Sequence, residues 1–207
     1  MSDYISDAEF RAYIKDGSAL EPDAVSAAIT AASRAVDAFC DRDFADAGVV
    51  SARKFVPCSG YEVDVDDFST TTGLLVAVDT GYDETYARTL TIGTDFRVEP
   101  VNQRRGGIAW PYDRLGASGP SVSLGYVFPV PVTGRPYTVR VTARWGWATV
   151  PEPIKHATKI LAARYYKLGE APFEQAGFGE FGVLTVRPPR AAIQLMQPYA
   201  RAVVAVA

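Results

Sequence analysis

Residues 137–168 constrain the fold more than any other stretch, because a strand pattern passes there into a helix pattern. Apolar and polar residues alternate from Tyr137 to Arg144, a two-residue period typical of a half-buried strand. Pro151 and Pro153 follow, and the fixed φ of proline suits only the first turn of a helix, so we expect a helix to begin at one of them. The apolar face of that helix is expected to consist of Ile154, Ala157, Leu161, Tyr165 and Leu168, with Gly169 as a left-handed C-cap.

Two more helices are expected before residue 45. Ser6 and Glu9 have the spacing of a capping box, and Ile5 and Phe10 have that of a hydrophobic staple, so a short helix should begin there and end by Gly17. A longer helix is expected to begin at Pro22. Its buried stripe, rich in alanine, is predicted to contain Val25, Ala28, Ile29, Ala32, Val36, Phe39 and Cys40.

After residue 44 the pattern changes to short strands and turns. Strands are predicted at 52–56, 61–65, 74–78, 88–92 and 95–99, where β-branched and aromatic residues lie between turn residues. The last two strands flank Gly93 and Thr94 and are predicted to form a hairpin. Residues 100–136 are predicted to be irregular, with Arg104, Arg105, Gly106 and Gly107 forming an exposed basic loop tip.

This order of elements predicts an α+β fold. The helices at the two ends of the chain can bury their apolar stripes only by packing against each other. Residues 1–44 and 148–207 are therefore expected to form one discontinuous helical domain, which is a small bundle. Residues 45–147 are expected to form a β-rich domain inserted into it. A short strand at 182–187 and a final helix from Ala191 complete the prediction.

Four pieces of the C-terminal half together resemble the head-to-tail connector, or adaptor, proteins of long-tailed double-stranded DNA bacteriophages. They are the run from Val141 to Ala157 (VTARWGWATVPEPIKHA), the run AARYYK at 162–167, the run AGFGEFG at 176–182, and the pair Pro198–Tyr199. The resemblance covers roughly residues 5–44 and 90–200. Residues 45–89 and the proline-rich stretch 120–136 lie outside it.

The resemblance implies a structural virion protein rather than an enzyme. Adaptors of this family form rings, usually of twelve subunits, between the portal of the capsid and the tail-side neck or stopper protein. The expected partners are therefore other copies of the chain, the portal, the neck protein, and genomic DNA that passes through the channel without sequence-specific binding. The expected location is the virion neck, with assembly in the bacterial host cytoplasm.

Two groups of apolar residues are predicted to contact subunits or partners. The first group is aromatic and consists of Trp145, Trp147, Phe178 and Phe181. The second is the C-terminal tail, in which Val203, Val204 and Val206 follow the last charge at Arg201. Because ordering a short tail costs backbone entropy, we expect it to become ordered against the portal or a neighbouring subunit; packing onto the chain's own β insert is the alternative.

Composition and charge exclude several classes of protein. No stretch approaches the ~20 apolar residues of a membrane span, and the N-terminus lacks a basic region followed by an apolar run, so we expect neither a membrane contact nor a secretory signal. Cys40 and Cys58 are expected to be buried reduced thiols. Residues 1–100 contain 8 Lys/Arg and 19 Asp/Glu, whereas residues 101–207 contain 13 Lys/Arg and 5 Asp/Glu. This difference in net charge between the two halves could align subunits in an assembly, or it could reflect two unrelated solvated faces.

No motif supports catalysis, a cofactor or a metal. The run from Gly177 to Gly182 matches G-x-G-x-x-G but follows a helix and precedes a strand, the reverse of a dinucleotide site. Asp64, Asp66 and Asp67 lack the glycine and distal glutamate of a calcium loop and are expected in a solvated acidic turn. His156, the only histidine, is expected on a helix surface or interface.

One alternative function belongs to another class. Trp145 and Trp147 could stack on the bases of a single-stranded nucleic acid, with Arg140 and Arg144 contributing a basic groove. An enzymatic function is the least favoured hypothesis, because the sequence shows no nucleophile–base pair and no metal-binding cluster.

Overall fold

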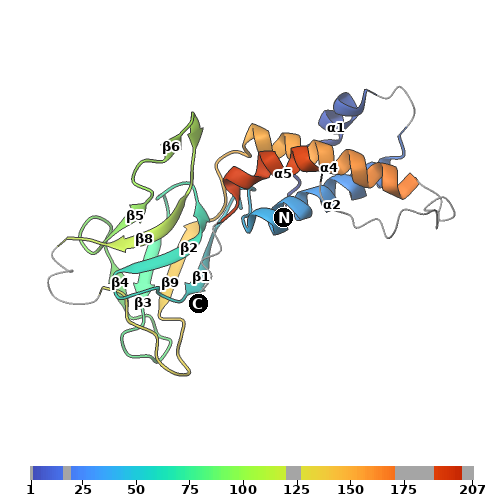
Figure 1. Cartoon of the computed structure of the whole chain (residues 1–207). Helices are drawn as coiled ribbons and strands as arrows, with labels where there is room; N and C mark the ends of the chain where they lie inside the picture. The colour runs from blue at the N-terminus through green and yellow to red at the C-terminus, as the bar shows by residue number, and fades with distance from the viewer. Residues whose placement is uncertain (1, 16–19, 120–126, 171–188, 202–207) are drawn as a thin grey trace. The chain divides into compact units, whose positions relative to one another are not determined.

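A computed structural model describes residues 2–15, 20–119, 127–170 and 189–201. The chain divides into two compact units, residues 1–45 with 150–207 and residues 46–149. The first is helical and the second is built from antiparallel strands (Figure 1). The predicted α+β class is therefore confirmed.

In its described residues, the helical unit has two helices from each end of the chain. They are α1 (Asp7–Ile14), α2 (Pro22–Cys40), α4 (Glu152–Glu170) and α5 (Arg190–Met196), and α5 continues into a 3-10 turn, Gln197–Tyr199. The predicted capping box is present: the Glu9 amide donates to Ser6 Oγ at 3.2 Å, and the Ser6 amide donates to Glu9 Oε2 at 2.9 Å. Helix α2 begins at Pro22, as expected for a residue that needs no amide partner.

The core of this unit forms where α2 packs against α4 and α4 against α5. The predicted stripe of α2 is buried except Phe39, which is 37% exposed. On α4 the first three predicted positions are buried, but Tyr166 is buried rather than Tyr165, and Leu168 is exposed. Gly169 lies inside the helix instead of capping it, so that prediction is wrong.

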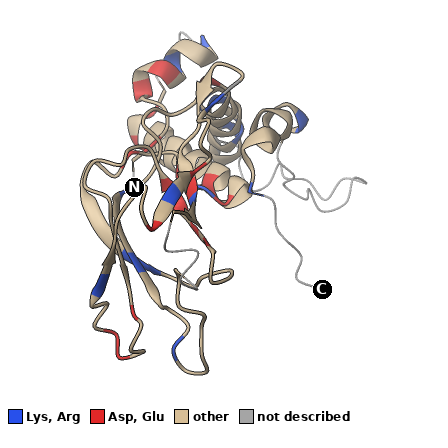
Figure 2. Ribbon diagram, turned by 90° about the vertical axis from the view of Figure 1, so that its left-hand side faces the viewer, with Lys and Arg blue, Asp and Glu red and all other residues tan. Residues whose placement is uncertain are grey.

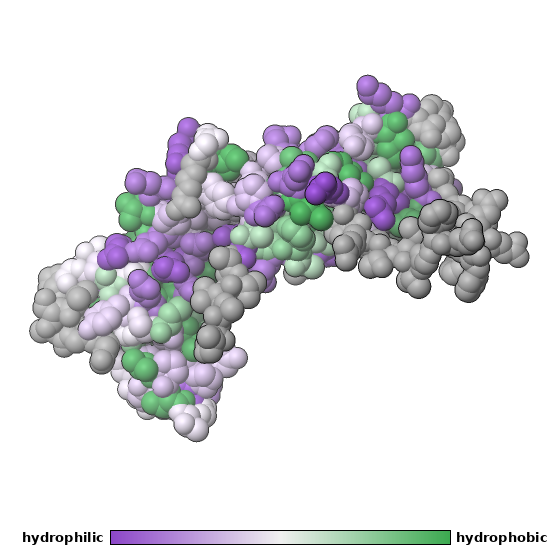
Figure 3. All heavy atoms as spheres, viewed as in Figure 1, coloured by the Kyte–Doolittle hydropathy of each residue, from purple (hydrophilic) through white to green (hydrophobic). Residues whose placement is uncertain are grey.

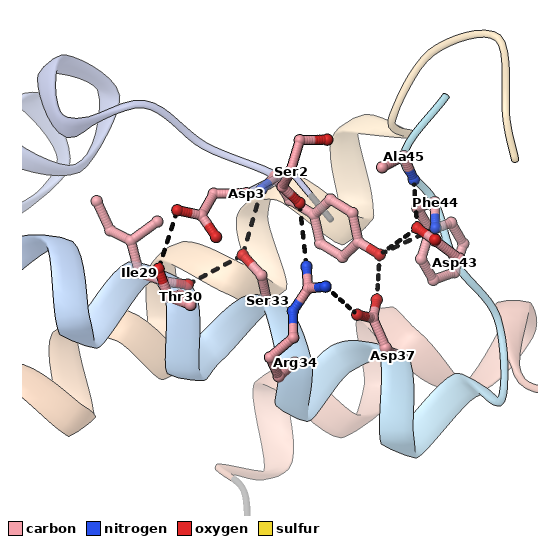
Figure 4. A network of polar contacts seen from close by, with 11 residues as sticks. Ser2, Asp3, Ile29, Thr30, Ser33, Arg34, Asp37, Asp43, Phe44 and Ala45 are labelled. Atoms are coloured by element: carbon pink, nitrogen blue, oxygen red, sulfur yellow. Dashed lines mark hydrogen bonds and ion pairs between the residues drawn. The ribbon is translucent and has the colours of Figure 1, made fainter. Parts of the chain in front are cut away.

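A polar network fixes the N-terminal segment to α2 (Figure 4). The Tyr4 hydroxyl donates to the Asp37 carboxylate and accepts from the Phe44 amide at 2.9 Å, while the Tyr4 amide donates to Ser33 Oγ at 3.2 Å. Arg34 lies 3.3 Å from the other oxygen of Asp37. Burial raises the pKa of both the Tyr4 phenol and the Asp37 carboxyl, and the hydrogen bond to Asp37 raises that of Tyr4 further.

Replacing Tyr4 by phenylalanine should lower the free energy of unfolding by about 1–3 kcal/mol, because the Phe44 amide and Asp37 each lose their bond to the hydroxyl. Chemical denaturation followed by circular dichroism measures the change. Tyr13→Phe is the matched control, since the Tyr13 ring is 37% exposed. Equal stability of the two variants would show that the buried hydroxyl contributes nothing.

The described residues of the β unit form two sheets and a small hairpin. The four-stranded sheet has the order β1 (Val50–Phe55), β9 (Val139–Arg144), β3 (Leu75–Val78), β4 (Arg88–Leu90). The three-stranded sheet has the order β2 (Glu62–Phe68), β8 (Tyr112–Ala117), β5 (Phe96–Glu99). The hairpin pairs β6 (Arg104–Arg105) with β7 (Ile108–Ala109).

The two sheets share one apolar core. Strand β9 shows the predicted alternation, with Val139, Val141 and Ala143 buried, and Val141 pairs with Val76 of β3. Val63, Val65 and Leu115 from the three-stranded sheet belong to the same cluster. Successive side chains of a strand point to opposite faces of its sheet, so the alternation of apolar and polar residues places one face of β9 in this core.

The five strands predicted between residues 52 and 99 are present as β1 to β5, but three other predictions for this unit were wrong. Strands β4 and β5 do not form a hairpin: β4 pairs with β3 and β5 with β8, in different sheets. Strand β8 lies within the stretch predicted to be irregular. Asp64, Asp66 and Asp67 lie on β2 rather than in a turn, and Asp67 is buried.

Candidate assembly surfaces

Trp145, predicted to be a contact residue, is buried inside the β unit. Its side chain is 2% exposed, and its indole N–H donates to the Ser51 carbonyl at 2.9 Å. The rings of Phe55 and Phe68 lie 5.6 and 6.2 Å from it, and the Arg53 guanidinium covers one face at 4.7 Å. A buried indole with a satisfied N–H is a core residue, so this ring offers no face to a partner.

Trp147 is buried in the same unit and is 1% exposed. Its indole N–H donates to Asp67 Oδ2 at 2.8 Å, and its ring lies 5.3 Å from that of Trp110. Stacking on bases requires exposed rings. The expectation that the two tryptophans contact other subunits or partners is therefore wrong. The alternative function, binding of a single-stranded nucleic acid through these two rings, loses its basis as well.

The other predicted contact residues lie outside the described residues. They are Phe178 and Phe181 in the glycine run and Val203, Val204 and Val206 in the tail. The strand predicted at 182–187 and the G-x-G-x-x-G match also lie there, so these expectations stay predictions.

Most of the described cations of the β unit are paired with carboxylates on its surface, and Figure 2 shows basic and acidic segments next to one another on the strands. The ion pairs are Arg53–Asp66, Lys54–Glu84, Arg88–Asp95, Arg97–Glu99, Arg114–Asp64, Arg135–Glu84 and Arg144–Asp46. The hydrogen bond from Arg144 lowers the pKa of Asp46, and the one from Lys54 lowers that of Glu84. Arg140 has no carboxylate but lies 4.8 Å above the Tyr86 ring.

An open pocket of about 540 Å³ lies on the β unit. Its lining is Asp46, Gly48, Val50, Ser69, Thr70, Thr72, Gly73, Arg144 and Ala148. The Arg144 guanidinium is bound to Asp46 on this wall, so the pocket presents hydroxyl groups and a neutralised ion pair. We assign no ligand to it.

The remaining candidate residues show no catalytic arrangement. His156 is exposed on α4, with its ring edge-on to Tyr13 at 5.7 Å. Both cysteines are free; Cys40 is buried, which raises its pKa to about 12, whereas Cys58 is exposed, contrary to prediction. Within the described ranges, His, Cys, Asp and Glu form no cluster that could hold a metal ion.

Helix α2 has a second stripe of alanines, which is exposed to solvent, whereas the first stripe is buried. Its members recur at three- and four-residue steps and are Ala24, Ala27, Ala31, Ala35 and Ala38; all are exposed except the half-buried Ala35. This exposed stripe contains no charge. Figure 3 shows apolar spots scattered among polar residues on the viewed face, one of them over α2. Small side chains permit close approach of another helix, so the exposed stripe is a candidate packing surface.

Comparisons with known proteins give one informative result. No protein-family model matches the sequence, and no curated protein matches it. Among solved structures, a chain from the neck of an empty GTA (gene transfer agent) particle, computed with C6 symmetry, has a TM-score of 0.59 at 19% identity. The likeness covers 99% of this chain and 93% of that one.

The chain shares the fold of that neck protein chain. Because the likeness spans nearly the whole of both chains, it includes the β unit as well as the helical unit. Residues 45–89, which the sequence resemblance to phage adaptors did not cover, are therefore part of the shared fold. At this identity the likeness shows the fold alone.

Among the helices of the described residues, none combines the length and the apolar composition that a membrane span needs.

Proposed function

We propose that the protein is a structural subunit of the neck of a phage-like particle. One observation carries the proposal: a neck protein chain has the same fold over almost the full length of both chains. The adaptor-like runs in the C-terminal half of the sequence support it independently. The proposal assigns the protein no catalytic activity, cofactor or metal.

In its finer form the proposal is an adaptor ring between the portal and the tail-side neck or stopper protein, with DNA passing through the channel. A ring of twelve copies is compatible with sixfold symmetry such as that used for the GTA neck. Contacts between neighbours in a closed ring are heterologous, so each subunit needs two different surfaces. The exposed stripe of α2 is one such surface, because it is long, uncharged and made of small residues.

The experiment combines the purified protein with portal-bearing heads that lack it. We expect the protein to sediment with these heads and to appear as a ring below the portal in cryo-electron microscopy maps. Heads without a portal are the control and should bind none. Binding spread over the capsid surface, or no binding to either kind of head, would contradict a neck function.

A further inference from the structure

The β6–β7 hairpin carries Arg104, an exposed arginine of the β unit. Figure 1 shows it projecting beyond the two sheets. Its turn is formed by Gly106 and Gly107, both with positive φ (58° and 81°), as a tight two-residue hairpin requires. A Cβ on either glycine would meet no atom within 4 Å, so the turn projects into open space.

Within the described residues, the charge of Arg104 on this hairpin is not compensated. Residues 100–112 contain two arginines and no Asp or Glu. Arg104 is exposed, and among the described Lys and Arg side chains of the β unit it alone has neither a carboxylate nor an aromatic ring as partner. Since the fold pairs its other described cations, this charge is available for an external anion.

The base of the hairpin is held firmly. The Trp110 amide donates to the Gln103 carbonyl at 2.7 Å, and the Trp110 ring packs on Trp147 at 5.3 Å. Trp147 is in turn bound to Asp67. The exposed Arg104 therefore extends from a fixed base, which limits the conformational entropy lost when the hairpin binds.

We infer that this hairpin contacts the phosphate backbone of double-stranded DNA, an inference that rests on the proposed neck function. Arginine binds phosphate as a charged fork, and such contacts are independent of base sequence. A glycine tip offers too little side-chain area for a stable protein interface, which needs roughly 800 Å² from each partner. Individual phosphate contacts need no such area, and they break readily when DNA moves through a channel.

The test compares two double variants of the full-length protein, Arg104→Gln with Arg105→Gln and Arg97→Gln with Arg114→Gln. Both remove two positive charges, but Arg97 and Arg114 are already paired with Glu99 and Asp64. Binding to a fluorescent 30-base-pair duplex is measured by anisotropy at several salt concentrations. We expect only the hairpin variant to lose affinity, with the slope of log K against log salt reduced by about 1 for each arginine removed.

Each outcome has a defined meaning. Equal affinity and slope in wild type and hairpin variant would overturn the inference, as would equal losses in the two double variants. A hairpin variant that binds DNA normally but enters necks poorly would also overturn it, because the tip would then contact an acidic protein surface. Neck incorporation of the wild type is scored separately with portal-bearing heads, so failure of the proposed function is distinguished from failure of the hairpin assignment.

Discussion

Replacing Trp145 by alanine should lower the free energy of unfolding by about 3–5 kcal/mol, a large fraction of the total stability of an ordinary domain. The indole is 2% exposed and packs between Phe55 and Phe68, so its removal leaves a cavity that the sheets cannot close. The Ser51 carbonyl also loses its donor. Urea denaturation followed by circular dichroism measures the loss.

Trp145→Phe separates the contributions of the ring and the N–H. Phenylalanine keeps most of the apolar volume but cannot donate to Ser51, so we expect a smaller loss of about 1–3 kcal/mol. Tyr137→Ala is the exposed control, because its side chain is 55% exposed and removing it leaves no buried cavity. If Trp145→Ala unfolded at the same urea concentration as the wild type, the ring could not be part of the core.

The two tryptophans show what the sequence alone could not decide. A Trp pair two residues apart is compatible with a core, a subunit contact or a stacking surface. The decision depends on the partners of the two indole N–H groups, Ser51 and Asp67, which lie 94 and 80 residues away along the chain. No local pattern predicts which acceptors the fold brings to these positions.

The pairing of the strands was less predictable than the helices, because it depends on partners distant in the sequence. The capping box of α1 and the buried stripe of α2 follow from neighbouring residues. The capping box was predicted correctly, and so was the stripe except for the exposed Phe39. Strand β8 has little alternation and contains Gly116, and it forms because β2 and β5 pair with it on either side. A Cβ at Gly116 would lie 2.7 Å from Glu99 Oε1, so a larger residue there would have to displace that side chain.

The predicted hairpin between β4 and β5 failed for a similar reason. The turn itself is present: the Asp95 amide donates to the Thr91 carbonyl, and the Thr91 amide donates to the Asp95 carboxylate at 2.8 Å. This turn redirects the chain from one sheet to the other instead of returning it beside β4. The Gly93–Thr94 pattern predicts the turn but not the sheet to which the next strand belongs.

Replacing Ala31 by arginine should strongly reduce assembly into necks and leave the isolated chain folded. Ala31 is at the middle of the exposed stripe of α2, where a neighbouring helix could approach closely only if the side chain is small. An arginine there would hold the two helices apart and place a charge in an apolar contact. Arginine is a good helix former, so the free energy of unfolding should change by less than about 0.5 kcal/mol.

Ser26→Arg is the matched control, because Ser26 is exposed on another side of the same helix. Both variants add the same charge to α2. A difference in their binding to heads would therefore come from the position of the arginine on the helix, and not from the change in net charge. Thermal unfolding measures the fold, and co-sedimentation with portal-bearing heads measures assembly. We expect Ala31→Arg to weaken the association constant with heads at least about tenfold, which corresponds to 1.4 kcal/mol or more of binding free energy, and Ser26→Arg to bind normally. If both variants bound normally, the exposed stripe would not be a subunit contact; if both failed, repulsion by the added charge would be the cause.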